Sequence, residues 1–357
     1  MREFSVTAAV APQAPRSPDA DPNTAAPETR HSHPVLAFLG RRVAAAILTL
    51  VVASFLIFAA TEALPGNPAT AVLGKGASPQ EVRQLDAKLG LDHPFVVRYL
   101  DWLGDAVTGN FGNSAAAIAQ GETTGASVLG LIKDPLLNSA VLAAMTALLM
   151  IPFSLGLGVL AGVRAGRKTD HAVSVIALIF SSMPEFVLGA VLIFVFFSKL
   201  RLLPPVALVQ PGQSPLANLR QLVLPVLTLL LVTGAWGIRQ MRAGVVEVMD
   251  RHYVTMARLN GYRERRVIAH YVVRNALAGS VQITAQNLQY LMGGIIVVEE
   301  VYSYPGIGKF LVSAVAAHDF REVEAVAVVL AAVYLLINII ADLVVVFLVP
   351  KLRTQLA

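Results

Sequence analysis

The chain has 357 residues, of which 55% are hydrophobic and only 14% charged, and its mean hydropathy is +0.64. These values exclude an ordinary soluble protein and indicate a polytopic membrane protein. The net charge is +5, but the basic residues lie beside apolar runs, where membrane topology and anionic lipid account for them, so we expect no nucleic acid among the partners. The lack of cysteine excludes disulfides, thiolate metal sites and cysteine nucleophiles.

The N-terminal region divides into a polar tail and a first apolar run. Residues 1–34 are rich in Pro, Ala, Thr and Asp and have no periodic apolar face, which predicts a disordered cytoplasmic tail. A cleaved signal peptide is the alternative for the run at residues 43–63, but the apolar region of such a peptide would be only about 7 to 15 residues long. We therefore expect residues 35–64 to form a retained first transmembrane helix.

The segment 65–135 is predicted to be external and to carry two short helices. Ser78 and Glu81 fit a capping box at the start of the first helix, and Gly90 is a suitable stop. A second helix is expected over residues 94–107, with aromatic and aliphatic residues on one side. That side would either pack on the membrane helices or receive a soluble partner.

Five further apolar runs each reach the roughly 20 residues that a helix needs to cross about 30 Å of hydrocarbon. They cover residues 136–163, 172–198, 222–241, 280–301 and 323–349. With the first run they predict an all-α protein with six transmembrane helices, because the runs are too long and too evenly apolar for barrel strands. Of the 28 Lys and Arg residues, 18 lie in the two termini and in the loops after the second and fourth spans. Both termini are therefore expected in the cytoplasm.

The basic loop between the fourth and fifth spans carries an ordered set of residues that resembles a known family. The set comprises Tyr253, Thr255, Ala257, Arg258, Gly261, Arg265 and Arg266, followed by Arg274, Asn275, Ala276 and Leu277. It resembles the coupling loop, or EAA loop, of ABC-importer permeases of the dipeptide, oligopeptide and nickel family. The general ABC-importer pattern begins with Glu-Ala-Ala and ends with Ile-x-Leu-Pro. This chain departs from both, so the resemblance is to the peptide-permease branch.

Further matches to this family follow in order over residues 38–353. They lie at residues 64–68, 90–94, 99–103, 299–308, 338–342 and 350–353. The sequence of residues 299–308, Glu-Glu-Val-Tyr-Ser-Tyr-Pro-Gly-Ile-Gly, is similar to the signature Glu-x-Val-Phe-Ser-x-Pro-Gly-Leu-Gly of these permeases. Val349 stands where the terminal motif of the family usually has an Asp.

The resemblance implies a type I ABC-importer permease fold in the prokaryotic cytoplasmic membrane, with a five-helix core at residues 136–357 and a cytoplasmic coupling loop at 242–278. It implies a non-catalytic subunit that moves dipeptides or oligopeptides, with nickel or another small solute as the alternative. The implied partners are a second homologous permease, two ATP-binding-cassette ATPase domains that bind ATP and Mg, an extracytoplasmic solute-binding protein, and membrane lipid. No cofactor is expected in this chain, because residues 162–169 lack the glycine spacing of a phosphate loop.

The coupling residues that match, from Tyr253 to Arg266, are expected to dock on the ATPase. An ATPase can move membrane helices only through a rigid element that is seated on it. The small Ala257 would permit close approach, and Gly261 accepts a positive φ at a helix stop. The preference for positive charge in the cytoplasm would explain the arginines of this loop but not the ordered match.

Polar residues inside the predicted spans are candidates for the translocation path. Glu185 lies near the middle of the third span, directly after Pro184, where a carboxylate needs a polar partner or water. It would contact a cationic group of the solute or pair with a partner subunit. Gln282, Gln286 and Gln289 share one face of the fifth span, which suits either a translocation path or interhelical hydrogen bonds.

Two other functions stay open at this stage. A proton-coupled secondary transporter would use intramembrane charges, and an intramembrane hydrolase would need a catalytic arrangement. The seven histidines show no His-Glu-x-x-His or comparable metal-ligand spacing, and the sequence contains no Gly-x-Ser-x-Gly elbow. We therefore predict no catalytic residues and no metal ligands.

Overall fold

The computed structural model describes residues 34–63, 68–74, 76–90, 92–119, 127–210 and 212–348. These residues are almost entirely helical, and they form no sheet beyond one isolated bridge between Asn113 and Ser127. The predicted all-α class is thus confirmed. The predicted tail and the family match at 350–353 lie outside the described residues, and the division into domains stays a prediction.

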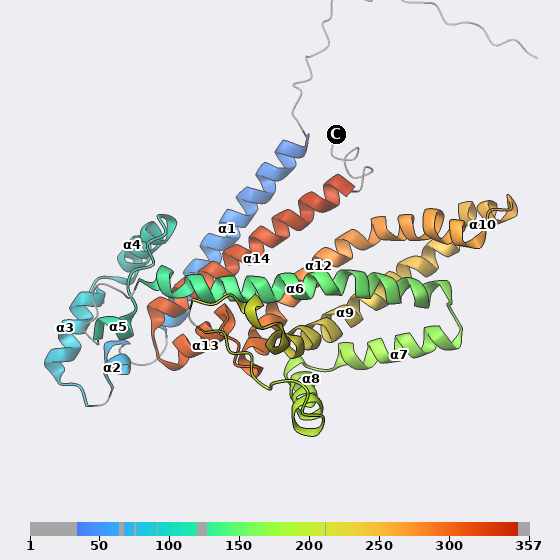
Figure 1. Cartoon of the computed structure of the whole chain (residues 1–357). Coiled ribbons are helices and arrows are strands. Elements are labelled where there is room, and N and C mark those ends of the chain that lie inside the picture. The colour runs from blue at the N-terminus through green and yellow to red at the C-terminus, as the bar shows by residue number, and fades with distance from the viewer. Residues whose placement is uncertain are drawn as a thin grey trace, which may run out of the picture.

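Five long helices build most of the molecule, and shorter helices join them (Figure 1). The long helices are α1 (Pro34–Glu62), α6 (Val128–Val163), α9 (Leu219–Met249), α12 (Arg274–Val301) and α14 (Phe320–Leu348). The shorter helices are α2 (Pro68–Leu73), α3 (Pro79–Leu89), α4 (Phe95–Val107), α5 (Ala115–Ala119), α7 (Lys168–Ser182), α8 (Glu185–Leu192), α10 (His252–Leu259), α11 (Glu264–Arg266) and α13 (Ile307–Ala316). Two π-helical segments, Ile193–Lys199 and Val267–Val273, and a 3₁₀ turn, Pro215–Asn218, complete them.

By length and apolar composition, four helices of the described residues can cross a membrane, namely α1, α6, α9 with its preceding 3₁₀ turn, and α14. The pair α7 and α8 adds a fifth if both helices are counted as one bent span. α12 is a continuous helix of 28 residues at the place of the predicted span 280–301. Six spans and cytoplasmic termini stay predictions. α6 begins at Val128, before the predicted residue 136, because Pro135 lies inside the helix and does not end it.

The third predicted span, residues 172–198, is not one helix, which corrects the sequence-based expectation. α7 ends at Ser182 and α8 begins at Glu185, and the two axes are inclined by 107°. Met183 has the extended conformation that a residue before proline prefers. Pro184 has no N–H to donate to the preceding turn. Pro184 therefore breaks the span, and Glu185 lies at the start of a new helix.

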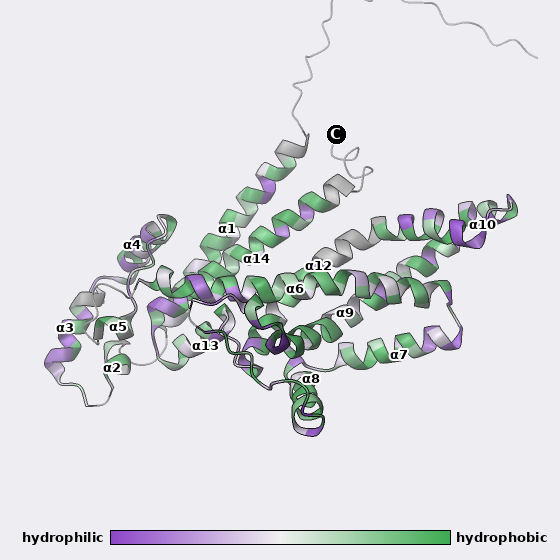
Figure 2. Ribbon diagram, in the orientation of Figure 1, coloured by the Kyte–Doolittle hydropathy of each residue, from purple (hydrophilic) through white to green (hydrophobic). Residues whose placement is uncertain are grey.

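α9 is the central helix of the molecule. In the apolar stretch of 18 residues that would cross the membrane, 67% of the residues of α9 are buried, compared with 11% of those of α1. α9 packs against α6, α7, α8 and α12, and its Leu224 and Leu229 belong to the largest apolar core together with Leu142 and Ile295. α1 and α14 lie side by side and away from this centre (Figure 1). The long helices are mainly hydrophobic, whereas hydrophilic residues gather at α3 and α10 (Figure 2).

Two glycines bring α6 close to α9, as their four-residue spacing indicates. A Cβ atom on Gly158 would lie 2.9 Å from Cγ of Met241, and a Cβ atom on Gly162 would lie 2.6 Å from Cβ of Val245. Both distances are shorter than a normal contact between carbon atoms. Only glycine therefore permits this approach of the two helices.

The segment before α6 contains both predicted short helices. Ser78 and Glu81 form the capping box of α3, and Gly90 ends the helix with a φ of 68°. The backbone N–H and the hydroxyl of Ser78 lower the pKa of the Glu81 carboxyl group by donating hydrogen bonds to it. In α4, Tyr99 packs on Phe58 of α1 with 5.6 Å between ring centroids. The aromatic side of α4 thus rests on a membrane helix.

The α6–α9 contact generates a stability prediction. Gly158→Ala should lower the free energy of unfolding by about 1–3 kcal/mol, because the new methyl group overlaps Met241 in a packed interface. Thermal unfolding of the purified protein in detergent measures this change. Gly156→Ala is the matched control, since Gly156 is exposed on the same helix and has no atom within 4 Å of its Cβ position. Equal stability of both variants would show that the helices do not depend on close approach.

Candidate coupling surface and membrane cavity

One face of α10 packs against the protein's own apolar core. Only Asp250 and Arg251 separate it from the end of α9. Its Val254 and Ala257 are 0% and 3% exposed, and they belong to an apolar cluster with Val245 of α9. α10 lies at the opposite end of the long helices from α2–α5 (Figure 1). We expected the small side chain of Ala257 to permit close approach of the ATPase. This expectation is wrong, because Ala257 is buried and its small side chain instead permits α10 to pack closely on its own chain.

The outward face of α10 is apolar and exposed. Tyr253, Met256 and Leu259 follow one another at a spacing of three residues, and Tyr262 extends the row. Met256 is 60% exposed and Leu259 is 75% exposed. Sequence reasoning included Tyr253 but missed Met256 and Leu259. The signal that could have found them is the i, i+3 spacing of large apolar side chains in a basic, polar loop.

The polar and charged coupling residues surround this apolar face. Thr255, Arg258, Arg265 and Arg266 are all exposed. The Arg258 guanidinium donates two hydrogen bonds to the Glu264 carboxylate, and these bonds raise the pKa of Arg258. Arg266 lies over the ring of Tyr262 at 5.1 Å from its centroid. Gly261 ends the helical turn with a φ of 76°, which confirms the expected glycine stop.

A cavity of about 660 Å³ lies among α1, α8, α12 and α14. Its polar and aromatic lining consists of Thr49, Glu185, Gln289, Tyr290 and Tyr334. Tyr290 and Glu185 line the same part of the cavity wall. Among the described residues, no Lys, Arg or His forms an ion pair with Glu185. Glu185 thus faces a space in which a ligand or water can reach a carboxylate.

The predicted glutamine stripe is only partly represented in this cavity. Gln289 lines it and also hydrogen-bonds to Asn338 of α14. Gln286 is exposed and is not among the lining residues. The side chain of Gln282 lies outside the described residues. The structure therefore brings Glu185 and Gln289 together and leaves Gln286 apart from them.

The signature at residues 299–308 forms a hydrogen-bonded turn between α12 and α13. The Glu299 side chain is fully buried, and its carboxylate accepts a hydrogen bond from Ser139 of α6. It also accepts a 2.7 Å hydrogen bond from the backbone N–H of Gly308. A Cβ atom on Gly306 would overlap the Glu299 carboxylate, which explains a glycine at this place. The hydrogen bonds of the signature therefore connect α6, α12 and α13.

Comparison with known proteins identifies the family. Residues 154–354 match the family model described as "Binding-protein-dependent transport system inner membrane component". Residues 35–139 match the model of the N-terminal part of such a membrane component. Together these two matches include the cavity-lining helices and the whole of α10.

Several named relatives match along nearly their whole length. A "Probable peptide ABC transporter permease protein" of Sinorhizobium fredii is 29% identical over 316 residues, covering 88% of this chain and 99% of the relative. A peptide transport system permease protein, so named, of Brucella abortus is 31% identical over 317 residues, covering 89% and 99%. A "Metal-staphylopine import system permease protein" of Staphylococcus aureus is 28% identical over 320 residues, covering 88% and 98%.

Membership of this family places the chain in the bacterial inner membrane, where it is a component of a transport system that depends on a binding protein. An ATPase and a solute-binding protein are thus among its partners in general terms. The chain belongs to the family of binding-protein-dependent transport system inner membrane components and is an ABC-importer permease of the peptide and nickel type.

Proposed function

We propose that this permease imports dipeptides or oligopeptides. The observation that carries the proposal is the match along nearly the whole chain to permeases named for peptides. The cavity supports it, because a space of about 660 Å³ with a carboxylate suits a solute that carries an ammonium group. A complex of a metal with a small molecule is the second candidate, favoured by the similarity to the metal-staphylopine permease.

In this proposal the chain performs no covalent step. Two ATPase domains bind ATP and Mg, a second homologous permease completes the path, and an extracytoplasmic protein delivers the solute. ATP binding closes the ATPases, pulls on residues 253–266 and opens the path outward. The exposed apolar row on α10 supports docking, because a contiguous apolar patch outside the membrane spans is typical of a protein interface.

The choice of solute is tested by uptake into proteoliposomes that contain the complete importer and its binding protein. We expect ATP-dependent uptake of labelled dipeptides or tetrapeptides that unlabelled peptides suppress. Labelled nickel, offered alone and with a small-molecule chelator, is the parallel arm. Uptake of nickel with no uptake of any peptide would contradict the proposal and favour the second candidate.

Docking of α10 generates a second prediction. Leu259→Glu should reduce co-purification of the ATPase at least tenfold, because it replaces the most exposed apolar side chain of the row with a carboxylate that the proposed contact would have to desolvate. Pull-down from detergent extracts, quantified against the amount of permease, measures this loss. Leu259→Met retains the apolar area and should behave as the unchanged protein does. ATPase recovery and uptake that are normal in Leu259→Glu would refute docking through this face.

The proposed role of Glu185 in the translocation path generates a third prediction. Glu185→Gln keeps the shape of the side chain but removes its charge. We expect normal assembly and at least fivefold weaker uptake of cationic peptides, with smaller effects on acidic peptides. Tyr290→Phe is the matched control, because it removes a hydroxyl group from the same cavity while leaving the charge of Glu185 in place.

Other outcomes for Glu185→Gln have distinct meanings. If Glu185 instead pairs with a cation of the second permease, neutralisation strands that cation at a cost of about 3–5 kcal/mol, and assembly should fail. Normal assembly with unchanged uptake of every peptide would remove Glu185 from both roles. Assembly and uptake are therefore measured on the same preparations.

A further inference from the structure

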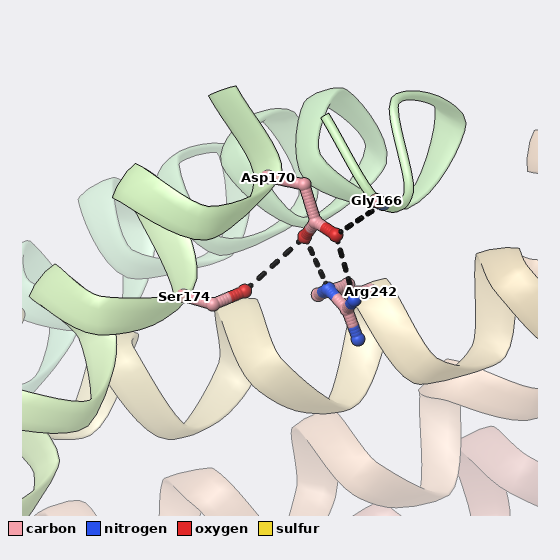
Figure 3. A network of polar contacts seen from close by, with 4 residues as sticks. All are labelled: Gly166, Asp170, Ser174 and Arg242. Carbon is pink, nitrogen blue, oxygen red and sulfur yellow. Dashed lines mark hydrogen bonds and ion pairs between the residues drawn. The ribbon is translucent and has the colours of Figure 1, made fainter. Parts of the chain in front are cut away.

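Asp170, in the first turn of α7, forms an ion pair with Arg242 of α9, whose side chain is 34% exposed (Figure 3). Asp170 is 1% exposed. Its Oδ1 accepts a 2.5 Å hydrogen bond from Nε of Arg242, and its Oδ2 accepts a 2.7 Å bond from Nη2. The backbone N–H of Gly166 and the hydroxyl of Ser174 donate at 2.9 and 3.2 Å. Both carboxylate oxygens thus accept hydrogen bonds, and the contact between Asp170 and Arg242 is bidentate.

This pair is the bidentate ion pair of the α7–α9 contact. Elsewhere the two helices meet mainly through apolar side chains, including Ala177 of α7 against Ala235 and Ile238 of α9. The exception is an exposed 3.3 Å hydrogen bond from the Arg239 guanidinium to the Ser181 hydroxyl. Apolar contacts of this kind have no preferred register and permit packed helices to slide by small amounts. A bidentate Arg–carboxylate contact fixes both distance and orientation. The pair therefore sets the register of α7 on α9.

The pair also lies on the part of α9 that carries the seat of α10. Met241 and Val245, which flank Arg242 along α9, belong to the apolar cluster that buries Val254 and Ala257 of α10. Arg242 thus pairs with α7 from the same stretch of α9 on which α10 packs.

At its other end, α7 leads to the cavity. α7 ends at Ser182, and after the break at Pro184 the chain turns by 107° into α8, whose first residue is Glu185. A displacement of α7 along α9 would move this corner. The fold therefore contains a continuous connection from α10 through α9, the ion pair and α7 to Glu185 in the cavity.

We propose that the Asp170–Arg242 pair is a positioning link that makes α7 follow α9 when the ATPase moves α10, and so passes the motion to the corner at Pro184 and Glu185. The link rests on the proposed docking of α10. An ion pair with one buried partner adds little to stability compared with apolar residues of similar volume, but it is well suited to fixing the register between two elements. Loss of the link should uncouple ATP hydrolysis from transport.

The test uses the complete importer with its binding protein in proteoliposomes and measures uptake and ATP hydrolysis on one preparation. Asp170→Asn keeps the shape of the side chain but removes the charge that holds Arg242. Its single carbonyl oxygen can replace the acceptor for Gly166 or the acceptor for Ser174, which bond to different oxygens of Asp170. We expect normal assembly, ATP hydrolysis within about twofold of the unchanged protein, and at least tenfold less solute imported per ATP. Glu247→Gln is the matched control, since Glu247 lies on α9 as Arg242 does and forms an exposed ion pair with Arg251. The change should leave this ratio unchanged.

A second variant keeps the test decisive if Asp170→Asn fails to assemble. Arg242→Lys preserves the positive charge but cannot make the bidentate contact, so solute per ATP should fall by a smaller factor than in Asp170→Asn. Unchanged solute per ATP in an assembled variant would overturn the proposal. An equal fall in uptake and ATP hydrolysis would also overturn it, and so would failure of both variants to assemble. Either result would show that the pair contributes to stability alone.

Failure of this link is distinguishable from failure of the docking proposal. If α10 does not dock on the ATPase, Leu259→Glu will retain the ATPase. If α10 docks but the Asp170–Arg242 pair does not transmit its motion, Leu259→Glu will lose the ATPase while Asp170→Asn imports a normal amount of solute per ATP.

Discussion

Hydrocarbon offers no hydrogen-bond partners, and this constraint organises the polar residues of the helical core. Buried Glu299 of α12 is satisfied by Ser139 of α6 and by backbone N–H groups of the following turn. Buried Glu324 of α14 accepts a 2.6 Å hydrogen bond from Thr61 at the end of α1. In each case the donor comes from a different helix. Satisfying a polar group therefore also fixes how two helices are placed, which apolar packing alone does only loosely.

Glu185 is the informative exception to this pattern. Glu299 and Glu324 are buried and accept hydrogen bonds from other helices, whereas Glu185 faces a cavity and forms no ion pair among the described residues. Non-helical backbone at membrane depth is tolerated where it is buried in protein or lines a wet cavity. The break at Pro184 meets that condition, because it delivers the first residue of α8 to the cavity wall. The break and the carboxylate are thus two parts of one feature.

Features that depend on neighbouring residues could be predicted from the sequence, and features that depend on distant partners could not. The capping box of Ser78 and Glu81 and the stop at Gly261 follow from local chemistry and are confirmed. The effect of Pro184 could not be settled in this way, because proline bends or breaks a span according to the partners that its surroundings supply. Asp170 and Arg242 are 72 residues apart in the chain, so only the packing of α7 on α9 brings them together.

The face of α10 that reaches a partner was equally beyond local reasoning. A basic helix with Tyr253, Met256, Ala257 and Leu259 can turn any of these residues outward, and the choice depends on which side finds an apolar seat. Here Val245 and Val267 provide the seat for Val254 and Ala257, which leaves the larger side chains exposed.

The same seat determines how α10 can act mechanically. Two residues connect α9 to α10, and four residues, 260–263, connect α10 to α11. From there α11 continues through the π-helical segment Val267–Val273 into α12 without a loop. Little chain is therefore available to absorb a displacement of α10. A force on its exposed face must pass into α9 and α12, and α9 holds both the close contact with α6 at Gly158 and the ion pair with Asp170. Directional contacts on a central helix transmit such a force more faithfully than apolar ones, because they resist sliding as well as separation.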